Sequence, residues 1–209
     1  SIDICATILK AAGITPPVTV TDATSSLRWG YQVSRHQDGD NQYVGVYRLS
    51  TTPAGYSDES VVKLPATAHV YLAGGVLDAA NGVMQTPAYL GETAEPKVTL
   101  KGAGSVLLAA LPYKISAFDV KIPTSARRGE DAVIKADVKT DGAKPGRHVA
   151  HVEVTDPTGL RHALYCGNVE LKDGKGEFVI PFALNDQAGR WRITVEGGMV
   201  PFLLKRIGK

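Results

Sequence analysis

Two pairs of neighbouring carboxylates could serve a glycosidase: Glu92 with Glu95, and Glu130 with Asp131. A retaining glycoside hydrolase needs two carboxyl groups about 5 Å apart in a cleft, one as nucleophile and one as acid and base. Both pairs lie in polar, turn-like stretches, where solvated surface carboxylates are the ordinary case. We therefore predict no catalytic residue and no enzymatic activity for this chain.

A serine among glycines occurs once, in Gly102-Ala103-Gly104-Ser105. A nucleophile elbow would read Gly-x-Ser-x-Gly and lead from a strand into a helix. Here the order differs and the apolar run 106–111 that follows has the length of a buried strand. The same strand excludes a dinucleotide-binding turn, which opens a helix. We expect a tight turn, because glycine reaches positive φ angles.

The acidic stretch 38–41 (Asp-Gly-Asp-Asn) invites comparison with a calcium-binding loop. Counted from Asp38, Tyr43 occupies the position of the loop glycine and Leu49 that of the bidentate glutamate. Alternating strand-like residues flank the stretch on both sides. The sequence therefore predicts a β-hairpin with its turn here.

Imidazole and thiol groups are few and scattered. His148 and His151 lie three residues apart on a predicted strand, so they point to opposite faces and cannot bind one metal together. His162 could approach one of them across a hairpin, but we predict no metal site. Cys5 and Cys166 could form a long-range disulfide or remain two buried free thiols, and the sequence favours free thiols.

Aromatic side chains follow both arms of the predicted hairpin: Trp29, Tyr31, Tyr43 and Tyr47. Aromatic rings stack on the apolar faces of sugars, and a sugar-binding platform here would use Trp29, Tyr31 and Tyr43. The alternative is that these rings form the core of a β-sandwich, because alternating aromatic residues are ordinary strand packing. The sequence favours the second alternative, in which these rings form the core.

Composition excludes several classes of function. The 209 residues carry a net charge of +2 with no face-sized cluster of Lys and Arg, which argues against nucleic acid as a partner. No window approaches the roughly 18 apolar residues of a membrane span, and the first residues lack the pattern of a signal peptide. None of the motifs requires a cofactor.

The first half of the chain predicts one helix followed by a β-domain. Residues 1–13 carry apolar side chains at helical spacing, and Gly13 is placed to end the helix. We assign residues 1–22 to a helix and linker at the tail of an upstream domain, and 23–113 to a first β-sandwich of six to eight strands. Its last strand lies in Val98–Ile115, which runs directly into the next domain. Pro112 and Tyr113 should form a stiff interdomain joint.

Residues 114–209 predict a second sandwich. Seven short stretches of alternating apolar residues are separated by turn residues such as Asp141-Gly142, Asp156-Pro157-Thr158-Gly159 and Asp173-Gly174. This spacing is typical of an immunoglobulin-like sandwich. The predicted fold class is therefore all-β: two tandem antiparallel β-sandwiches preceded by one short helix.

Both halves resemble known domain families. ARRGEDAVIKADVKTDGAKPGRHVAHVEVTDPTG with GEFVIPFALNDQAGRWRITV resembles macroglobulin-like or fibronectin-like sandwiches of large bacterial proteins, over residues 116–204. ILKAAGITPPVTV and VTLKGAGSVLLAALPY are similar to the end of the trimerisation domain, and to the closing strand of the following C-terminal domain, in β-galactosidase-type glycoside hydrolases. Arg35, Asp38, Gly39 and Tyr43 loosely match the hairpin of that C-terminal domain. The resemblance implies a catalytic barrel upstream and none of its catalytic residues in this chain.

These observations predict a non-catalytic, C-terminal accessory region of a multidomain carbohydrate-active enzyme, with the upstream domain of the same polypeptide as its partner. Two alternatives remain open. A free-standing carbohydrate-binding module would expose a row of aromatic side chains, whereas a structural or adhesion fragment of a cell-surface protein would be flanked by further sandwiches. The domain types favour an extracytoplasmic location, whether secreted, periplasmic or on the cell surface.

Overall fold

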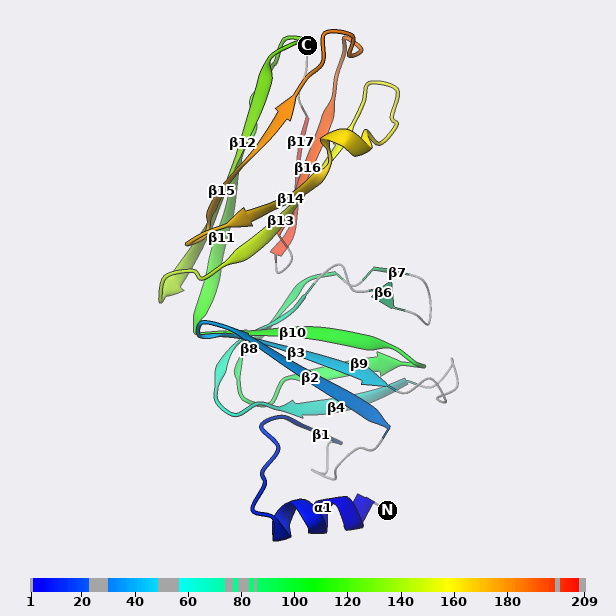
Figure 1. Ribbon diagram of the computed structural model, residues 1–209, viewed down its shortest axis with the longest axis vertical. Coiled ribbons are helices and arrows are strands. Elements are labelled where there is room, and N and C mark those ends of the chain that lie inside the picture. The colour runs from blue at the N-terminus through cyan, green and yellow to red at the C-terminus, as the bar shows by residue number, and fades with distance from the viewer. Residues whose placement is uncertain are drawn as a thin grey trace. The chain divides into compact units, whose positions relative to one another are not determined.

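The computed structural model describes residues 2–22, 30–48, 57–73, 77–78, 83–84, 86–197 and 200–206. Apart from one short helix and one 3₁₀ turn, its regular elements are β-strands, which confirms the predicted fold class (Figure 1). The chain divides into two compact units. The first comprises Ser1–Gln37 and Gln42–Leu111, and the second comprises Asp38–Asn41 and Pro112–Lys209.

Helix α1 (Ile2–Ala11) is followed by Gly13, the glycine predicted to end it. Gly13 has a φ of +66° and its N–H donates to the carbonyl of Lys10, while the N–H of Ile14 donates to the carbonyl of Leu9. This pair of bonds is the Schellman motif, which requires a left-handed residue where glycine is favoured. None of the described helices is long and apolar enough to cross a lipid bilayer.

The first unit contains two antiparallel sheets and a small hairpin. One sheet has the strand order β1-β4-β9, the second has the order β2-β3-β10-β5-β8, and β6 pairs with β7. The strands are β1 (Thr19–Thr21), β2 (Tyr31–Asp38), β3 (Asn41–Arg48), β4 (Ser57–Lys63), β5 (Ala68–Leu72), β6 (Leu77–Asp78), β7 (Val83–Met84), β8 (Ala88–Thr93), β9 (Lys97–Lys101) and β10 (Ser105–Leu111). Apolar side chains from both larger sheets form one core, including Val20, Val44, Val62, Val70, Leu100 and Leu108.

Strand β10 is the central strand of the five-stranded sheet. Val106, Leu108 and Ala110 point into the core, while Ala109 and Leu111 on the other face are also fully buried or nearly so. This confirms the prediction of a strand buried on both faces. Preceding it, Gly102 has a φ of +49° and makes the predicted turn, which carries the chain from one sheet to the other.

The alternation of Val and Thr over residues 18–21 predicts a strand, and Thr19–Thr21 form β1, which pairs with β4 and places Val18 and Val20 in the core. Further along the chain, the polar stretch 50–60 predicts a loop. Strand β4 instead begins at Ser57, inside this stretch. The first residues of β4 are polar, and the buried residues Ser60, Val61 and Val62 follow only in its second half.

The predicted hairpin is formed by β2 and β3. Asp38 and Asn41 end and begin the two strands, so Gly39 and Asp40 make a two-residue turn. Gly39 has a φ of +58°, while Asp40 is not among the residues with positive φ. Glycine at the first of two turn residues fits a type II′ turn, which matches the twist of the strands it joins.

The second unit is an immunoglobulin-like β-sandwich of seven strands, as predicted. They are β11 (Tyr113–Lys121), β12 (Asp131–Gly142), β13 (His148–Thr155), β14 (Gly167–Leu171), β15 (Lys175–Pro181), β16 (Arg192–Gly197) and β17 (Val200–Arg206). The sheets have the orders β11-β12-β15 and β14-β13-β16-β17. The fourth strand pairs with the third here, whereas in antibody constant domains it lies on the sheet of the first strand.

The fourth strand starts two residues later than expected. The sequence pattern places the start of this strand at Tyr165, but Ala163–Tyr165 forms the 3₁₀ turn η1 and the strand starts at Gly167. Tyr165 is still buried, because the turn directs its ring into the core. A single turn with one buried aromatic residue has the same local pattern as the start of a strand.

Successive antiparallel strands bring three connections to one end of this sandwich: 122–130 after β11, 156–166 after β13 and 182–191 after β15. We call this the loop end of the second unit. It lies at the far end of β11 from Tyr113. Pro112 alone separates β10 from β11. The stiff joint at Pro112 and Tyr113 stays a prediction.

Candidate functional site

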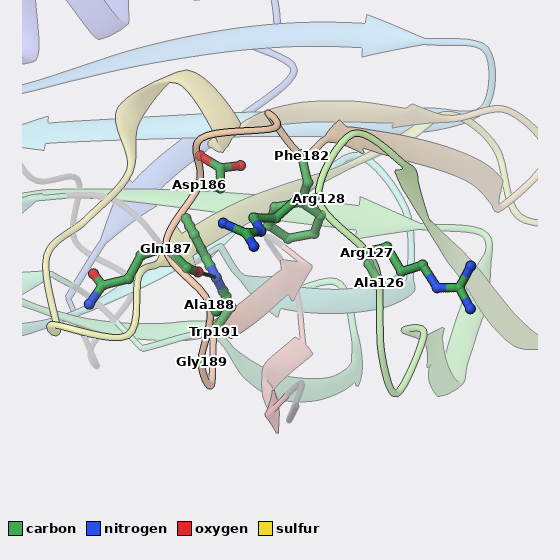
Figure 2. Close-up of a pocket in the computed structure, with 9 residues that line it drawn as sticks. All are labelled: Ala126, Arg127, Arg128, Phe182, Asp186, Gln187, Ala188, Gly189 and Trp191. Carbon is green, nitrogen blue, oxygen red and sulfur yellow. Dashed lines mark hydrogen bonds between the residues drawn. The ribbon is translucent and has the colours of Figure 1, made fainter.

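The loop end of the second unit contains a pocket of about 430 Å³ (Figure 2). Two of the three connections form it. The residues that line it are Ala126, Arg127, Arg128, Phe182, Asp186, Gln187, Ala188, Gly189 and Trp191. Its volume is at the lower end of the range for sites that take small ligands.

Two aromatic rings form the floor of the pocket. Phe182 and Trp191 are each 7% exposed, and their ring centroids lie 5.2 Å apart in an edge-to-face arrangement. The indole N–H of Trp191 donates to the backbone carbonyl of Gln187 at 3.0 Å, which fixes the ring against the loop. The floor is therefore preformed by the hydrophobic core of the unit.

A carboxylate is held rigidly at the side of the pocket. One oxygen of Asp186 accepts hydrogen bonds from the hydroxyl of Tyr165 at 2.6 Å and from the backbone N–H of Ala183 at 2.7 Å. Burial raises the pKa of the Tyr165 hydroxyl, and its hydrogen bond to Asp186 raises it further. The tyrosine thus remains a donor at neutral pH and keeps the carboxylate in place.

Two arginines follow each other in the connection 122–130. Arg127 lies 4.0 Å from Glu130 in an exposed ion pair, while Arg128 makes no ion pair or hydrogen bond with the residues that the structure describes. In Figure 2, the side chain of Arg128 extends toward the connection that carries Asp186, whereas that of Arg127 extends away from it. The pocket therefore combines a rigid aromatic floor, a fixed carboxylate and an open cation.

The sequence identifies the segments that form this pocket, but it does not show that they meet. The sequence predicts turns at Arg128-Gly129-Glu130 and at Asn185-Asp186, and a strand that includes Trp191, whereas β16 begins one residue later at Arg192. The signal that could have found the site is the pairing of two turn-flanking motifs, ARRGE and NDQAGRW, at the same end of a sandwich. That signal is readable only once the order of the strands in both sheets is known.

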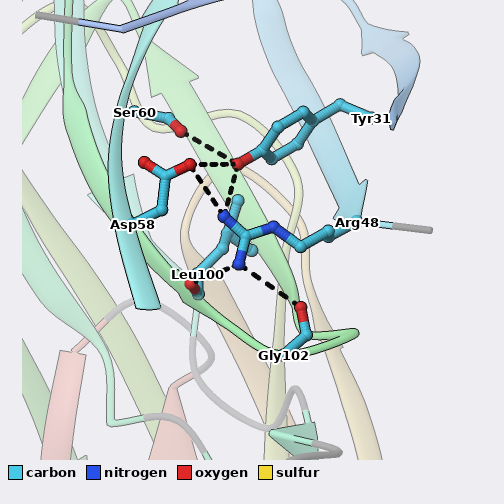
Figure 3. Close-up of polar contacts among 6 residues, drawn as sticks. All are labelled: Tyr31, Arg48, Asp58, Ser60, Leu100 and Gly102. Carbon is cyan, nitrogen blue, oxygen red and sulfur yellow. Dashed lines mark hydrogen bonds and ion pairs between the residues drawn. The ribbon is translucent and has the colours of Figure 1, made fainter. Parts of the chain in front are cut away.

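The first unit holds a second polar cluster, buried between its two sheets (Figure 3). Arg48, on the five-stranded sheet, donates to the carboxylate of Asp58 at 3.0 Å and to the carbonyl of Leu100 at 3.0 Å. It also donates to the hydroxyl of Tyr31 at 2.7 Å. Asp58 and Leu100 are cross-strand partners in the three-stranded sheet. Arg48 therefore clamps one sheet to the other.

This clamp determines the environment of one predicted sugar-stacking residue. The hydroxyl of Tyr31 lies within hydrogen-bonding distance of Arg48, Asp58 and Ser60, and its ring packs against the core of the first unit. Tyr31 is half-buried. The side chain of Tyr31 thus packs in the sandwich, which is the alternative to a sugar-binding platform.

The other two predicted stacking residues do not join Tyr31. Trp29 lies outside the described residues. Tyr43 alternates with the core residues Val44 and Val46 along β3, so it lies on the opposite face of the sheet from Tyr31. On that face, Tyr43 is in a row with Ala109, Tyr71 and Tyr89 on the neighbouring strands. Binding of sugar at Trp29, Tyr31 and Tyr43 stays a prediction.

The other candidate groups are dispersed. Glu92, Glu95, Glu130 and Asp131 are all exposed. Over the residues that the structure describes, no group of three His, Cys, Asp or Glu side chains is arranged to hold a metal ion. His162 stacks on Tyr165 with ring centroids 4.1 Å apart.

Cys166 is a free thiol, as the sequence favours. It is half-buried and packs against the core of the second unit. Its Sγ accepts from the N–H of Val154 and donates to the carbonyl of His162, each at 3.3 Å. The side chain of Cys5 lies outside the described part of the chain.

A buried histidine in the second unit gives a pH-dependent prediction. His148 is 7% exposed, and its Nε2 lies 2.9 Å from the hydroxyl of Tyr113, which itself accepts from the N–H of Gly146 at 2.9 Å. The imidazole and the hydroxyl are thus both held inside the second unit by this hydrogen bond. Burial lowers the pKa of His148 below its ordinary value of 6.5.

We expect the second unit to lose stability as the pH falls below about 6.5, because the unfolded chain takes up a proton that folded His148 still refuses. The loss should stop once the pH passes below the folded pKa, and each unit of depression is worth about 1.4 kcal/mol. Urea unfolding of the wild type and His148→Gln across this range would measure it. Equal slopes in the two proteins would contradict the prediction.

Comparisons with known proteins find only remote structural similarity. No protein-family model matches the chain, and no curated protein sequence is detectably similar to it. The native conformation of E. coli alpha-2-macroglobulin aligns at 15% identity and a TM-score of 0.37, over 88% of this chain and 12% of that chain. Salmonella alpha-2-macroglobulin reacted with methylamine aligns at 14% and 0.36, over 86% and 12%.

A β-porphyranase of glycoside hydrolase family 86 from Bacteroides plebeius aligns at 13% identity and a TM-score of 0.28, over 86% of this chain and 36% of that chain. The chain thus spans only 12% to 36% of the length of these proteins. At such scores the likeness assigns neither a family nor an activity. The β-galactosidase-type resemblance stays a prediction.

Proposed function

We propose that this chain is a non-catalytic accessory region of a multidomain carbohydrate-active enzyme, attached through α1 to another domain of the same polypeptide. The observation that carries the proposal is the apolar face of α1. Ile4 and Ile8, one turn apart, are 63% and 60% exposed. An isolated helix of this length is marginal in water, so a face of this kind is stabilised by packing against a partner.

The partners of two carboxylates support a non-catalytic role. Asp58 is engaged by Arg48 within the clamp of the first unit, and Asp186 is engaged by Tyr165 and the backbone of its own loop. Both carboxylates therefore have structural partners, and they belong to different units. Retaining glycosidases instead place two carboxyl groups across one cleft.

Hydrogen exchange tests the proposed attachment of α1. We expect the amides of α1 to exchange much more slowly in the full-length polypeptide than in the 209-residue chain, because packing would cover Ile4 and Ile8. The double substitution Ile4→Ser and Ile8→Ser should remove this protection, whereas Lys10→Gln, an exposed polar change on the same helix, should preserve it. Equal exchange rates for α1 in the two contexts would overturn the proposal.

A second candidate is a carbohydrate-binding module, and the loop-end pocket favours it. Small-ligand sites combine apolar and aromatic linings with a few placed polar groups, as this pocket does. Glycan-array binding of the 209-residue chain tests this candidate. Failure to bind any saccharide below millimolar concentration would sink it and leave the accessory role in place.

A further inference from the structure

We infer that the loop-end pocket of the second unit binds an acidic saccharide, with Arg128 pairing to the carboxylate of the sugar and Asp186 accepting from a hydroxyl of the same ring. The choice of a sugar rests on the proposed carbohydrate-active role. The geometry of the pocket indicates that the sugar carries a carboxylate and hydroxyl groups. Three features carry the inference: the open guanidinium, the aromatic floor and the fixed carboxylate.

The open guanidinium selects for an anion. Arg128 is exposed, lines the pocket and has no carboxylate within ion-pair distance among the described residues. Its neighbour Arg127 already pairs with Glu130. A guanidinium presents two parallel N–H donors that fit a carboxylate in bidentate fashion. A neutral ligand would leave these donors to water.

The aromatic floor selects for a ring with an apolar face. Phe182 and Trp191 sit at the bottom of the pocket and are fixed by the core and by the indole hydrogen bond to Gln187. Such rings offer apolar area at little cost in conformational entropy, because they are already immobile. A volume of about 430 Å³ leaves room for a small hydroxylated ring and part of its neighbour.

The fixed carboxylate excludes a ligand that is anionic throughout. Asp186 Oδ2 is occupied by Tyr165 and Ala183, while Oδ1 has no hydrogen bond to the described residues. A second anion next to this oxygen would be repelled, so a bare sulfate or phosphate fits poorly. A hydroxyl group that donates to Oδ1 fits well. A ring with one carboxylate and several hydroxyls satisfies Arg128 and Asp186 together.

Calorimetric titration of the 209-residue chain with trigalacturonate tests the inference, with galactotriose as the uncharged match. We expect trigalacturonate to bind at least about tenfold more tightly, because only its carboxylates can pair with Arg128. Arg128→Gln should weaken trigalacturonate binding by about tenfold or more. Arg161→Gln, a matched change at an exposed arginine of the connection 156–166 that does not line the pocket, should weaken it less than about threefold.

Three outcomes would overturn the inference: trigalacturonate binds no more tightly than galactotriose, Arg128→Gln binds trigalacturonate like the wild type, or hexaglutamate binds more tightly than trigalacturonate. The first would leave a neutral-sugar site, and the third would make an acidic peptide the ligand. None of them touches the attachment of α1, which hydrogen exchange tests separately.

Discussion

Replacing Arg48 by methionine is expected to lower the free energy of unfolding of the first unit by about 3–5 kcal/mol. Arg48 and Asp58 have side chains that are only 3% and 7% exposed. Removing the guanidinium leaves a buried charge on Asp58 and deprives the carbonyl of Leu100 of its donor. Methionine keeps most of the volume of the arginine stem, so the loss should reflect the polar contacts more than a cavity.

The matched control is Lys97→Met, which removes the ion pair between Lys97 and Glu59. Glu59 is the residue next to Asp58 on the same strand, but its pair spans 3.5 Å and is 67% and 56% exposed. Exposed pairs contribute under about 1 kcal/mol, so this variant should unfold nearly like the wild type. Urea denaturation, with hydrogen exchange to resolve the two units, measures both.

A double variant separates two free energies: the destabilisation caused by an unpaired buried charge, and the net contribution of the intact ion pair to stability. Arg48→Met with Asp58→Leu removes both charges, and apolar replacement of a whole buried pair is often close to neutral. We expect the double variant to recover most of the stability that Arg48→Met loses. If Arg48→Met costs no more than Lys97→Met, the clamp does not hold the sheets together.

Much of this fold could be predicted because one face of each strand meets a core. Strand β9 alternates exposed and buried residues from end to end, and the sequence shows the same alternation in Val98 and Leu100. The turns could be predicted equally well. Asp173 and Gly174 both have positive φ, as expected of a two-residue hairpin turn built from Asp-Gly.

The clamp could not be predicted, because its partners are polar and far apart in the chain. Asp58 lies in a run of polar residues that indicates a loop, and Leu100 is 52 residues from Arg48. Local pattern says which side of a strand is apolar, but it does not give the register between strands. A buried charge is visible only when the strand that neutralises it has been placed.

The loop-end pocket was hidden for a related reason. Each connection that forms it is an ordinary turn by composition, and a turn with arginines is usually a solvated surface. What makes a site is the meeting of two such turns over Trp191 and Phe182 at one end of a sandwich. The sequence contains the turns, whereas the sheet topology decides which of them are neighbours.

Trp191→Ala is expected to destabilise the second unit by about 3–5 kcal/mol, because it removes a large buried ring from the core. The indole lies against Phe182 at 5.2 Å, Tyr165 at 6.0 Å and His162 at 5.6 Å between ring centroids. No neighbour on the loop side can fill the space, since the pocket already lies there. Thermal or urea unfolding of the second unit measures the loss.

Two further variants separate packing from hydrogen bonding. Trp191→Phe keeps a ring but removes the donor to the carbonyl of Gln187. It should therefore destabilise the unit less than Trp191→Ala, by roughly the packing free energy of the ring atoms that phenylalanine retains. Leu184→Ala, an apolar truncation in the same connection at a side chain that is 79% exposed, should change stability by less than about 0.5 kcal/mol. If Trp191→Ala is as mild as Leu184→Ala, the ring is not a structural floor. Because Asp186 and Gln187 belong to the loop that the indole anchors, the same result would also remove the basis for a preformed pocket.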